Sequence, residues 1–207
     1  MAPILPLCDA SPRACRCAGS TLAELLIVGG LIATLHALAI PYLLATLDES
    51  RAVAAARYMS ARLYRTRTEA LGRSSNVGLR FVQTKDGYAY TVHADGNGNG
   101  LRTQDIQRGI DREISPAERL RDHFSGIDFG VAPDVPSVEP GGSPPGGDPI
   151  RVGVSNIVSF SALGTATPGS LYIRSPRGAQ YALRILGETG RTRLLRFNSR
   201  TRRWLPL

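Results

Sequence analysis

The sequence has three cysteines and one lysine, and each of these shortages excludes some chemistry. All three cysteines lie within the first 17 residues, so residues 18–207 offer no disulfide, cysteine nucleophile or cysteine-based zinc site. A phosphate-binding loop needs a lysine directly after a glycine, but the one lysine, Lys85, follows a threonine. A loop of this kind is therefore excluded. What remains is a chain of 207 residues, 43% hydrophobic and 20% charged, with a formal charge of +8 that comes from arginine. That composition is typical of a globular protein.

Nothing in the sequence indicates an active site. His36 falls within an apolar run, and no nucleophile motif of the G-x-S-x-G kind accompanies His93 or His123. The acidic pair Asp111 and Glu113 lies in polar, charge-mixed sequence, which favours a solvated surface. We therefore expect a protein that is not an enzyme and that holds no cofactor.

One long apolar stretch predicts a membrane helix. Residues 25–44 are twenty residues without a formal charge. As a helix rising about 1.5 Å per residue, they can cross about 30 Å of hydrocarbon. Arg13 and Arg16 precede the stretch, and Asp48 and Glu49 follow it. This charge bias predicts a single-pass membrane protein with a cytoplasmic N-terminus and an exported head.

Several processing routes are open to such a segment. A secretory signal peptide cut after Ala39 fits the A-x-A pattern, although the apolar region exceeds the usual length. A lipoprotein signal does not fit, because the cysteines precede the apolar run. A plain single-pass anchor fits the length alone.

A further route follows from residues 19–26, which read GSTLAELL. This segment resembles the type IV prepilin signature of glycine, a hydrophobic residue, Thr-Leu, any residue and glutamate, with Ser20 in place of the usual phenylalanine. The resemblance implies that a prepilin peptidase cuts between Gly19 and Ser20 and that Ser20 becomes N-methylated. It also implies that Glu24 neutralises the terminal amine of a neighbouring subunit in a fibre. Pro41 then occupies the position where pilins often carry a helix-kinking proline.

The helix is expected to continue beyond the membrane as a stem. Residues 48–72 contain no proline and no glycine before Gly72, which we expect to cap the helix. Spacing of three to four predicts a packed face, and most of the stem arginines fall elsewhere. The expected face comprises Val53, Ala56, Met59 or Ser60, Leu63 and Arg67, and the stem arginines are Arg51, Arg57, Arg62 and Arg65.

Residues 66–79, TRTEALGRSSNVGL, narrow the resemblance. They resemble the passage Ala-Arg-Ser-Glu-Ala, short turn, Val-x-Leu of the GspH/FimT family of type IV pilin-like proteins. That family comprises minor pseudopilins of type II secretion and minor pilins of type IV pilus biogenesis. The resemblance implies a pilin-like fold, with prepilin peptidase, the inner membrane and other pseudopilins or pilins of the same fibre as partners.

Alternating and β-branched runs after the stem predict antiparallel strands. They cover residues 77–82, 88–93, 150–154, 157–161, 169–174, 179–186 and 191–197. The expected fold class is α+β, with a long N-terminal transmembrane and stem α-helix packed on an antiparallel β-sheet head. The expected layout is a leader at 1–19, a transmembrane helix at 20–47, a stem at 48–72 and a head at 73–207. A Pro/Gly-rich segment at 133–149 predicts a mobile surface loop rather than a domain linker.

The loop after the second strand, residues 95–100, reads DGNGNG. Oxygen side chains at alternate positions resemble a calcium loop, for which Asp95, Asn97, Asn99 and Asp105 are the candidate ligands. The position of the bidentate carboxylate is occupied by Ile106, with Asp105 one place early. A glycine-rich turn without metal is therefore the favoured interpretation.

The C-terminal segment is strongly basic: from Arg174 onward nine arginines face one acid, Glu188. A tight hairpin at 188–189 places Arg184 opposite Arg193, with Arg191 on the same face. Like charges across a ladder repel, so this face requires open solvent or an anionic partner.

Residues 190–193, GRTR, resemble the Gly-Arg-x-Arg element of FimT-type minor pilins, for which DNA binding during uptake is described. The resemblance implies phosphate contacts from Arg184, Arg191, Arg193 and Arg202, because the planar guanidinium can grip phosphate bidentately. Phe197 and Trp204 are candidates to stack on bases. The same arginines would equally serve solubility, contact with lipid phosphates, or contact with residues 86–148, where eleven acids face five arginines.

Overall fold

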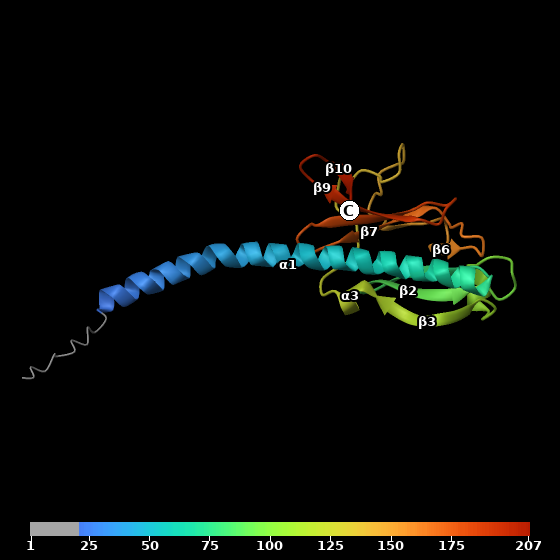
Figure 1. The fold of residues 1–207 in the computed structure, drawn as a ribbon, viewed down its shortest axis with the longest axis horizontal. Coiled ribbons are helices and arrows are strands. Elements are labelled where there is room, and N and C mark those ends of the chain that lie inside the picture. Colours follow the sequence, from blue (N-terminus) through green and yellow to red (C-terminus); the bar gives the residue numbers. More distant parts are fainter. Residues whose placement is uncertain (1–20) are drawn as a thin grey trace, which may run out of the picture. The chain divides into compact units, whose positions relative to one another are not determined.

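The computed structural model describes residues 21–207 and divides the chain into two compact units, Met1–Tyr42 and Leu43–Leu207. The expected leader and the expected cleavage positions Gly19 and Ser20 lie outside the described residues. The fold class predicted from the sequence is confirmed: a long N-terminal helix is followed by antiparallel strands (Figure 1).

Helix α1 runs from Leu22 to Arg73 as 52 continuous residues and includes Pro41. The prediction that Gly72 caps it is wrong. Ser74 takes the left-handed conformation, with φ of 50°, and the N–H of Ser75 donates to the carbonyl of Ala70. This is the bonding pattern of a Schellman cap, displaced by two residues from the glycine.

In the second unit α1 contributes one face to the core. Its buried residues are Ala52, Ala55, Ala56, Met59, Leu63, Thr66 and Ala70. The spacing of three to four is as predicted, and Ala56, Met59 and Leu63 are confirmed as members, whereas Val53 is only half-buried. The alanines let the strands approach the helix closely, because they fill little space.

Two antiparallel sheets form the head, whereas the sequence predicted one. The first has the order β3-β2-β1-β6, and the second has the order β10-β9-β8-β7-β4 with β5 also paired to β7. The first sheet comprises β1 (Val77–Thr84), β2 (Gly87–Ala94), β3 (Arg112–Arg119) and β6 (Ile157–Phe160). The second comprises β4 (Asp128–Phe129), β5 (Ile150–Arg151), β7 (Gly169–Arg174), β8 (Gln180–Ile185), β9 (Thr192–Asn198) and β10 (Arg203–Pro206). Two short helices, α2 (Thr103–Gln107) and α3 (Leu120–His123), flank β3.

The core lies between the sheets and α1. Leu79 and Tyr90 of the first sheet and Leu171 and Leu183 of the second join the buried helix residues in one cluster. Figure 1 shows the second half of α1 running between β2 and β3 on one side and β7 and β9 on the other. One helix face alone cannot cover two sheets, so the neighbouring half-buried helix residues also take part.

Residues 130–149, which include the loop predicted at 133–149, contain no helix or strand, but hydrogen bonds fasten them to the second sheet. The backbone N–H of Val138 donates to the hydroxyl of Tyr172 at 3.3 Å, and that of Ala132 donates to Oε1 of Gln180 at 2.9 Å. Trp204 Nε1 donates to the carbonyl of Pro136 at 2.9 Å. The loop thus covers the side chains on the sheet face that points away from α1.

Candidate functional site

The first candidate site is the apolar part of α1. From Leu22 to Leu47 every side chain is exposed, and Glu24 is the one formally charged residue in that stretch. Among residues 21–207 one helix, α1, is long and apolar enough to cross a membrane, with a mean hydropathy of 2.0 over its best window. A helix that is apolar all round and uncovered by protein needs lipid or other helices around it.

The carboxylate of Glu24 closes the first turn of this helix. The backbone N–H of Thr21 donates to Oε2 of Glu24 at 3.4 Å, and the N–H of Glu24 donates to Oγ1 of Thr21 at 3.3 Å. This is a capping box, which satisfies two amides that have no partner at a helix start. The Thr-x-x-Glu spacing was visible in the sequence, but it was interpreted only as part of the prepilin signature.

Pro41 lies in the C-terminal part of the apolar segment. It has no N–H to donate to the carbonyl four residues earlier, at Ala37, so the helix lacks one backbone hydrogen bond there. His36 precedes Ala37 directly, and its Nδ1 is hydrogen-bonded to the carbonyl of Ile32 at 2.8 Å. The helix nevertheless continues through this region.

A polar network that the sequence did not reveal ties the stem to β3. Arg62 donates from Nη2 to Oε1 of Glu118 at 2.6 Å, and the hydroxyls of Tyr58 and Tyr90 donate to Oε2 at 2.8 and 3.0 Å. Burial alone would raise the pKa of Glu118, but the two tyrosine hydrogen bonds and the charge of Arg62 lower it. Arg62 was expected off the packed face and is instead half-buried. No local pattern links residues so far apart in sequence.

A second unpredicted contact joins the stem to the arginine-rich hairpin. Gly190 has φ of 59°, and a Cβ there would collide with the carbonyl oxygen of Gly164 and lie 3.0 Å from Nε of Arg67. Arg67, expected on the packed face, is half-buried, and its Nε has no hydrogen-bond partner within the described chain. The glycine before Arg191 is therefore required by packing and backbone conformation.

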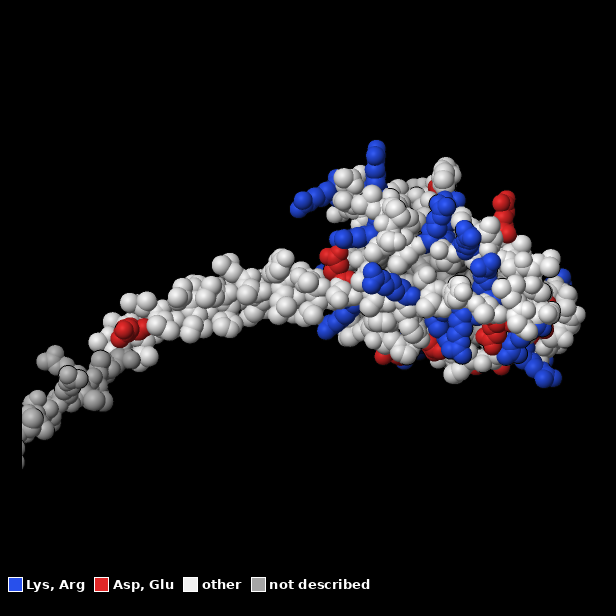
Figure 2. Space-filling model, in the orientation of Figure 1, with Lys and Arg blue, Asp and Glu red and all other residues white. Residues whose placement is uncertain are grey.

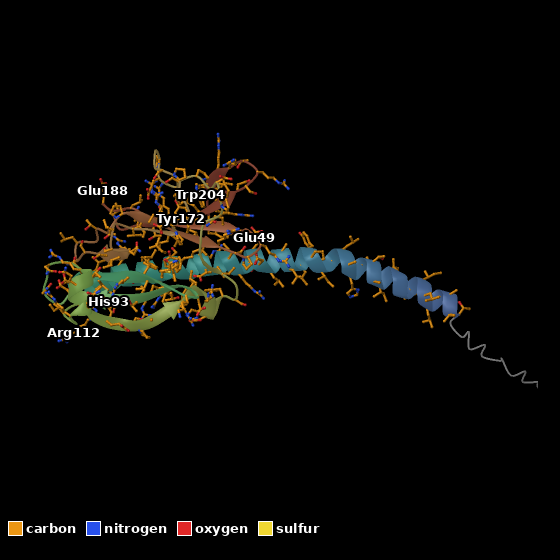
Figure 3. The ribbon with its side chains drawn as sticks, turned by 180° about the vertical axis from the view of Figure 1, so that it is seen from behind. Glu49, His93, Arg112, Tyr172, Glu188 and Trp204 are labelled. Atoms are coloured by element: carbon orange, nitrogen blue, oxygen red, sulfur yellow. The ribbon has the colours of Figure 1, made fainter. Side chains whose placement is uncertain are left out.

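The predicted arginine pair is present. Arg184 on β8 is directly opposite Arg193 on β9, and Arg191 is exposed just before β9 begins. Arg193 is also exposed and Arg184 is half-buried, and within residues 21–207 none of the three has an ion pair. Glu188, in the turn between the two strands, lies far from Glu49 in the side-chain view (Figure 3).

Arg202 does not belong to this group. It follows the far end of β9, so at about 3.4 Å per residue the strand separates it from Arg193 by about 17 Å. Its Nη2 donates to the carbonyl of Asp134 at 2.9 Å. Trp204, expected to stack on bases, packs against Phe197 with ring centroids 5.2 Å apart and donates to Pro136. Its indole is therefore engaged within the protein.

The loop at residues 95–100 directs its oxygens at its own backbone. Asp95 accepts the N–H groups of Asn97, Gly98 and Gly100, and these hydrogen bonds, with one from Asn76, lower its pKa despite the opposing effect of burial. The amide nitrogens of Asn97 and Asn99 donate to Asp105. The described residues contain no cluster of three or more histidine, cysteine or acidic side chains arranged to hold a metal.

Asp111 supports the same loop, and the prediction that it is solvated is wrong. It is buried and accepts the N–H of Gly96 at 3.2 Å and of Arg102 at 3.0 Å. His93, whose Nε2 is hydrogen-bonded to Thr91 at 2.8 Å, is buried too, and burial lowers its pKa. Figure 3 labels His93 near Arg112, at the end of the head opposite Glu49. Asp111 therefore holds the loop through its backbone amides, and His93 lies buried beside Thr91.

Comparison with known proteins gives one structural likeness. No protein-family model matches the chain, and no curated protein matches it. Among solved structures, the chain is similar to the minor pseudopilin EpsH from the type 2 secretion system of Vibrio cholerae, with a TM-score of 0.42. The two sequences are 18% identical, and the match covers 70% of this chain and 97% of that one.

Proposed function

We propose that the chain is a pilin-like minor subunit that a prepilin peptidase processes between Gly19 and Ser20. The mature protein is held in the inner membrane by α1, with its N-terminus cytoplasmic and its head periplasmic. It assembles through the N-terminal part of α1 into a periplasmic fibre that serves type II secretion or type IV pilus biogenesis. Glu24 and Pro41 act in that assembly. The work is mechanical rather than catalytic.

The observation that carries this proposal is the contrast along a single helix. Up to Leu47 α1 is apolar and uncovered, whereas from Ala52 the same helix packs into a folded head. A subunit of a helical fibre needs this arrangement, because the uncovered segment lies in lipid before assembly and against other helices afterwards. Glu24 is the one charged side chain in the uncovered segment, which supports the proposal that it pairs with a terminal amine of a neighbouring subunit.

The test is the intact mass and N-terminal sequence of the protein extracted from membranes of cells that contain a prepilin peptidase. A chain that begins at methylated Ser20 supports the proposal. The variant Gly19→Val is the control and should keep the leader. A chain that begins at Met1 would contradict processing, and one that begins at Ile40 would indicate a cleaved secretory signal.

A second candidate function is DNA capture, favoured by the unpaired arginines that face one another at Arg184 and Arg193. We infer that these two and Arg191 would bind phosphates, whereas Arg202 lies outside the group. Its test is DNA affinity as a function of salt, with Arg191→Ala/Arg193→Ala against the control Arg108→Ala/Arg112→Ala. Loss of affinity and of salt slope in the first pair alone would support DNA binding. Equal losses of DNA affinity in both double variants would mean that binding depends on net charge alone, which would contradict a specific site at these arginines.

A further inference from the structure

The apolar part of α1 ends within the second unit. Leu43, Leu44 and Leu47 are exposed there, and Asp48 and Glu49 are the first charged residues after them. A membrane helix that ends at this point places the two acids at the level of the lipid headgroups. Whatever packs against the two acids lies at that level too.

Two segments of the second sheet pack against these acids. The hydroxyl of Ser175, at the start of the β7–β8 turn, donates to Oδ2 of Asp48 at 2.5 Å. Arg196 of β9 forms an ion pair with Glu49. Glu49 is therefore paired with a cation, whereas Asp48 accepts a hydrogen bond from a neutral hydroxyl and keeps its charge.

The β7–β8 and β9–β10 turns carry a positive excess at this level. Arg177 and Arg200 are exposed, and neither has an ion pair within residues 21–207. The second turn is ordered, because Oδ1 of Asn198 accepts the N–H groups of Arg200 and Thr201 at 3.0 and 3.2 Å. Figure 2 shows basic side chains gathered over the β9–β10 end of the second unit.

The surface between the turns is hollowed on a scale that suits a headgroup. One hollow of about 270 Å³ has Asp48, Glu49, Arg177, Arg196 and Ser199 among its lining residues. A second, of about 380 Å³, is lined by Arg196, Phe197, Asn198, Ser199, Arg200 and Leu205. Apolar side chains beside guanidinium groups match the boundary between headgroups and acyl chains.

We propose that Arg177, Arg196 and Arg200 form a binding surface for the phosphate headgroups of anionic phospholipids, here called the headgroup surface. The proposal rests on the membrane anchoring proposed above. Arg177 and Arg200 lie in the turns beyond the end of β9 that is remote from Arg193, and Arg196 is three residues from Arg193 along the strand. Guanidinium groups can bind phosphate bidentately. The headgroup surface would thereby hold the head against the bilayer before the subunit joins a fibre.

The test uses the full chain in nanodiscs, with Cys8, Cys15 and Cys17 replaced by serine and a fluorophore on Ser199→Cys. Discs of phosphatidylcholine alone are compared with discs that contain one quarter phosphatidylglycerol, each with the same amount of a headgroup-labelled quenching lipid. We expect quenching to be at least twofold stronger with phosphatidylglycerol and to fall at high salt. Arg177→Glu/Arg200→Glu should abolish the difference.

The matched control is Arg108→Glu/Arg112→Glu, which changes the net charge equally. Figure 3 shows Arg112 at the end of the head opposite Glu49. Equal quenching in the two lipid mixtures would overturn the headgroup surface, as would an equal effect of both double variants. A chain that does not co-fractionate with the discs would contradict membrane anchoring itself. Failure to co-fractionate differs from a chain that inserts normally but shows no lipid preference. The second outcome overturns the headgroup surface and leaves membrane anchoring intact.

Discussion

Thr21 and Glu24 hold each other through two reciprocal hydrogen bonds, one from each backbone N–H to the other's side chain. Glu24 therefore has two separable properties, an acceptor for the cap and a negative charge. Glutamine serves as well as glutamate in a capping box, whereas it cannot neutralise an amine.

We expect Glu24→Gln to keep the helix start and to lose assembly. The measurement is site-specific cross-linking between neighbouring subunits in membranes, alongside the helical signal of the purified protein. Thr21→Ala is the converse control, because it removes the cap at a cost of about 1 kcal/mol and keeps the charge. If Glu24→Gln cross-linked like the wild type, the charge-pairing role of Glu24 would be excluded.

The carboxylate of Glu118 is expected to stabilise the head in a pH-dependent way. Glu118→Gln should reduce the free energy of unfolding by about 1–3 kcal/mol at pH 7, because it removes the charge that pairs with half-buried Arg62. The pKa of Glu118 is lowered in the folded protein, so its contribution is complete above the unfolded-state pKa of about 4.3 and is lost as the pH falls through the folded-state value.

Chemical denaturation of wild type and Glu118→Gln at pH 7 and at pH 3 measures this contribution. The gap between the two proteins should narrow at the lower pH. Glu113→Gln, an exposed change on the same strand, serves as the control and should unfold like the wild type at both values. A gap independent of pH would assign the loss to packing instead of charge.

Gly190→Ala should destabilise the head by about 1–3 kcal/mol, because it forces a side chain into a left-handed position and against the carbonyl of Gly164. Gly178→Ala separates the two causes: it has φ of 93° and no atom within 4 Å of its Cβ, so it reports strain alone. Thermal unfolding of both variants gives the comparison. Equal losses would mean that the contact with Gly164 contributes nothing.

Trp204→Phe should loosen residues 130–149, since it removes the hydrogen bond to the carbonyl of Pro136 and keeps most of the ring packing. The expected loss of stability is about 0.5–1.5 kcal/mol. Limited proteolysis with cleavage sites mapped by mass reports the loop directly, and cleavage should become faster there. Leu205→Ala, exposed on the same strand, should leave the rate unchanged, and faster cleavage in that variant would indicate a general effect on β10.

Sequence reasoning succeeded where the signal is local. The apolar run, the helix face around Met59 and the hairpin that opposes Arg184 to Arg193 follow from periodicity and turn residues. It failed where distant contacts decide. The strand at Arg112–Arg119 is charged and contains Pro116, so it was not predicted, although pairing with β2 makes it a strand.

The candidate sites follow the same division. Glu24 could be proposed from the sequence because its spacing is a short motif, and its role stays a prediction. Asp111 was wrongly expected at a solvated surface, because its burial depends on the amides of Gly96 and Arg102. The contacts of Asp48 with Ser175 and of Glu49 with Arg196 join residues more than a hundred positions apart. No pattern in one sequence could have indicated them. The headgroup surface is therefore a product of tertiary structure alone.

The outer strands of both sheets discourage growth of the sheets from one molecule to the next. In the first sheet β3 carries Pro116 among charged residues and β6 has four residues. In the second, β10 ends at Pro206 and β4 has two residues. Short or proline-bearing borders offer few free amides to another strand, which protects against aggregation. Copies crowded side by side can thus remain separate folded bodies and keep their heads from fusing into a common sheet.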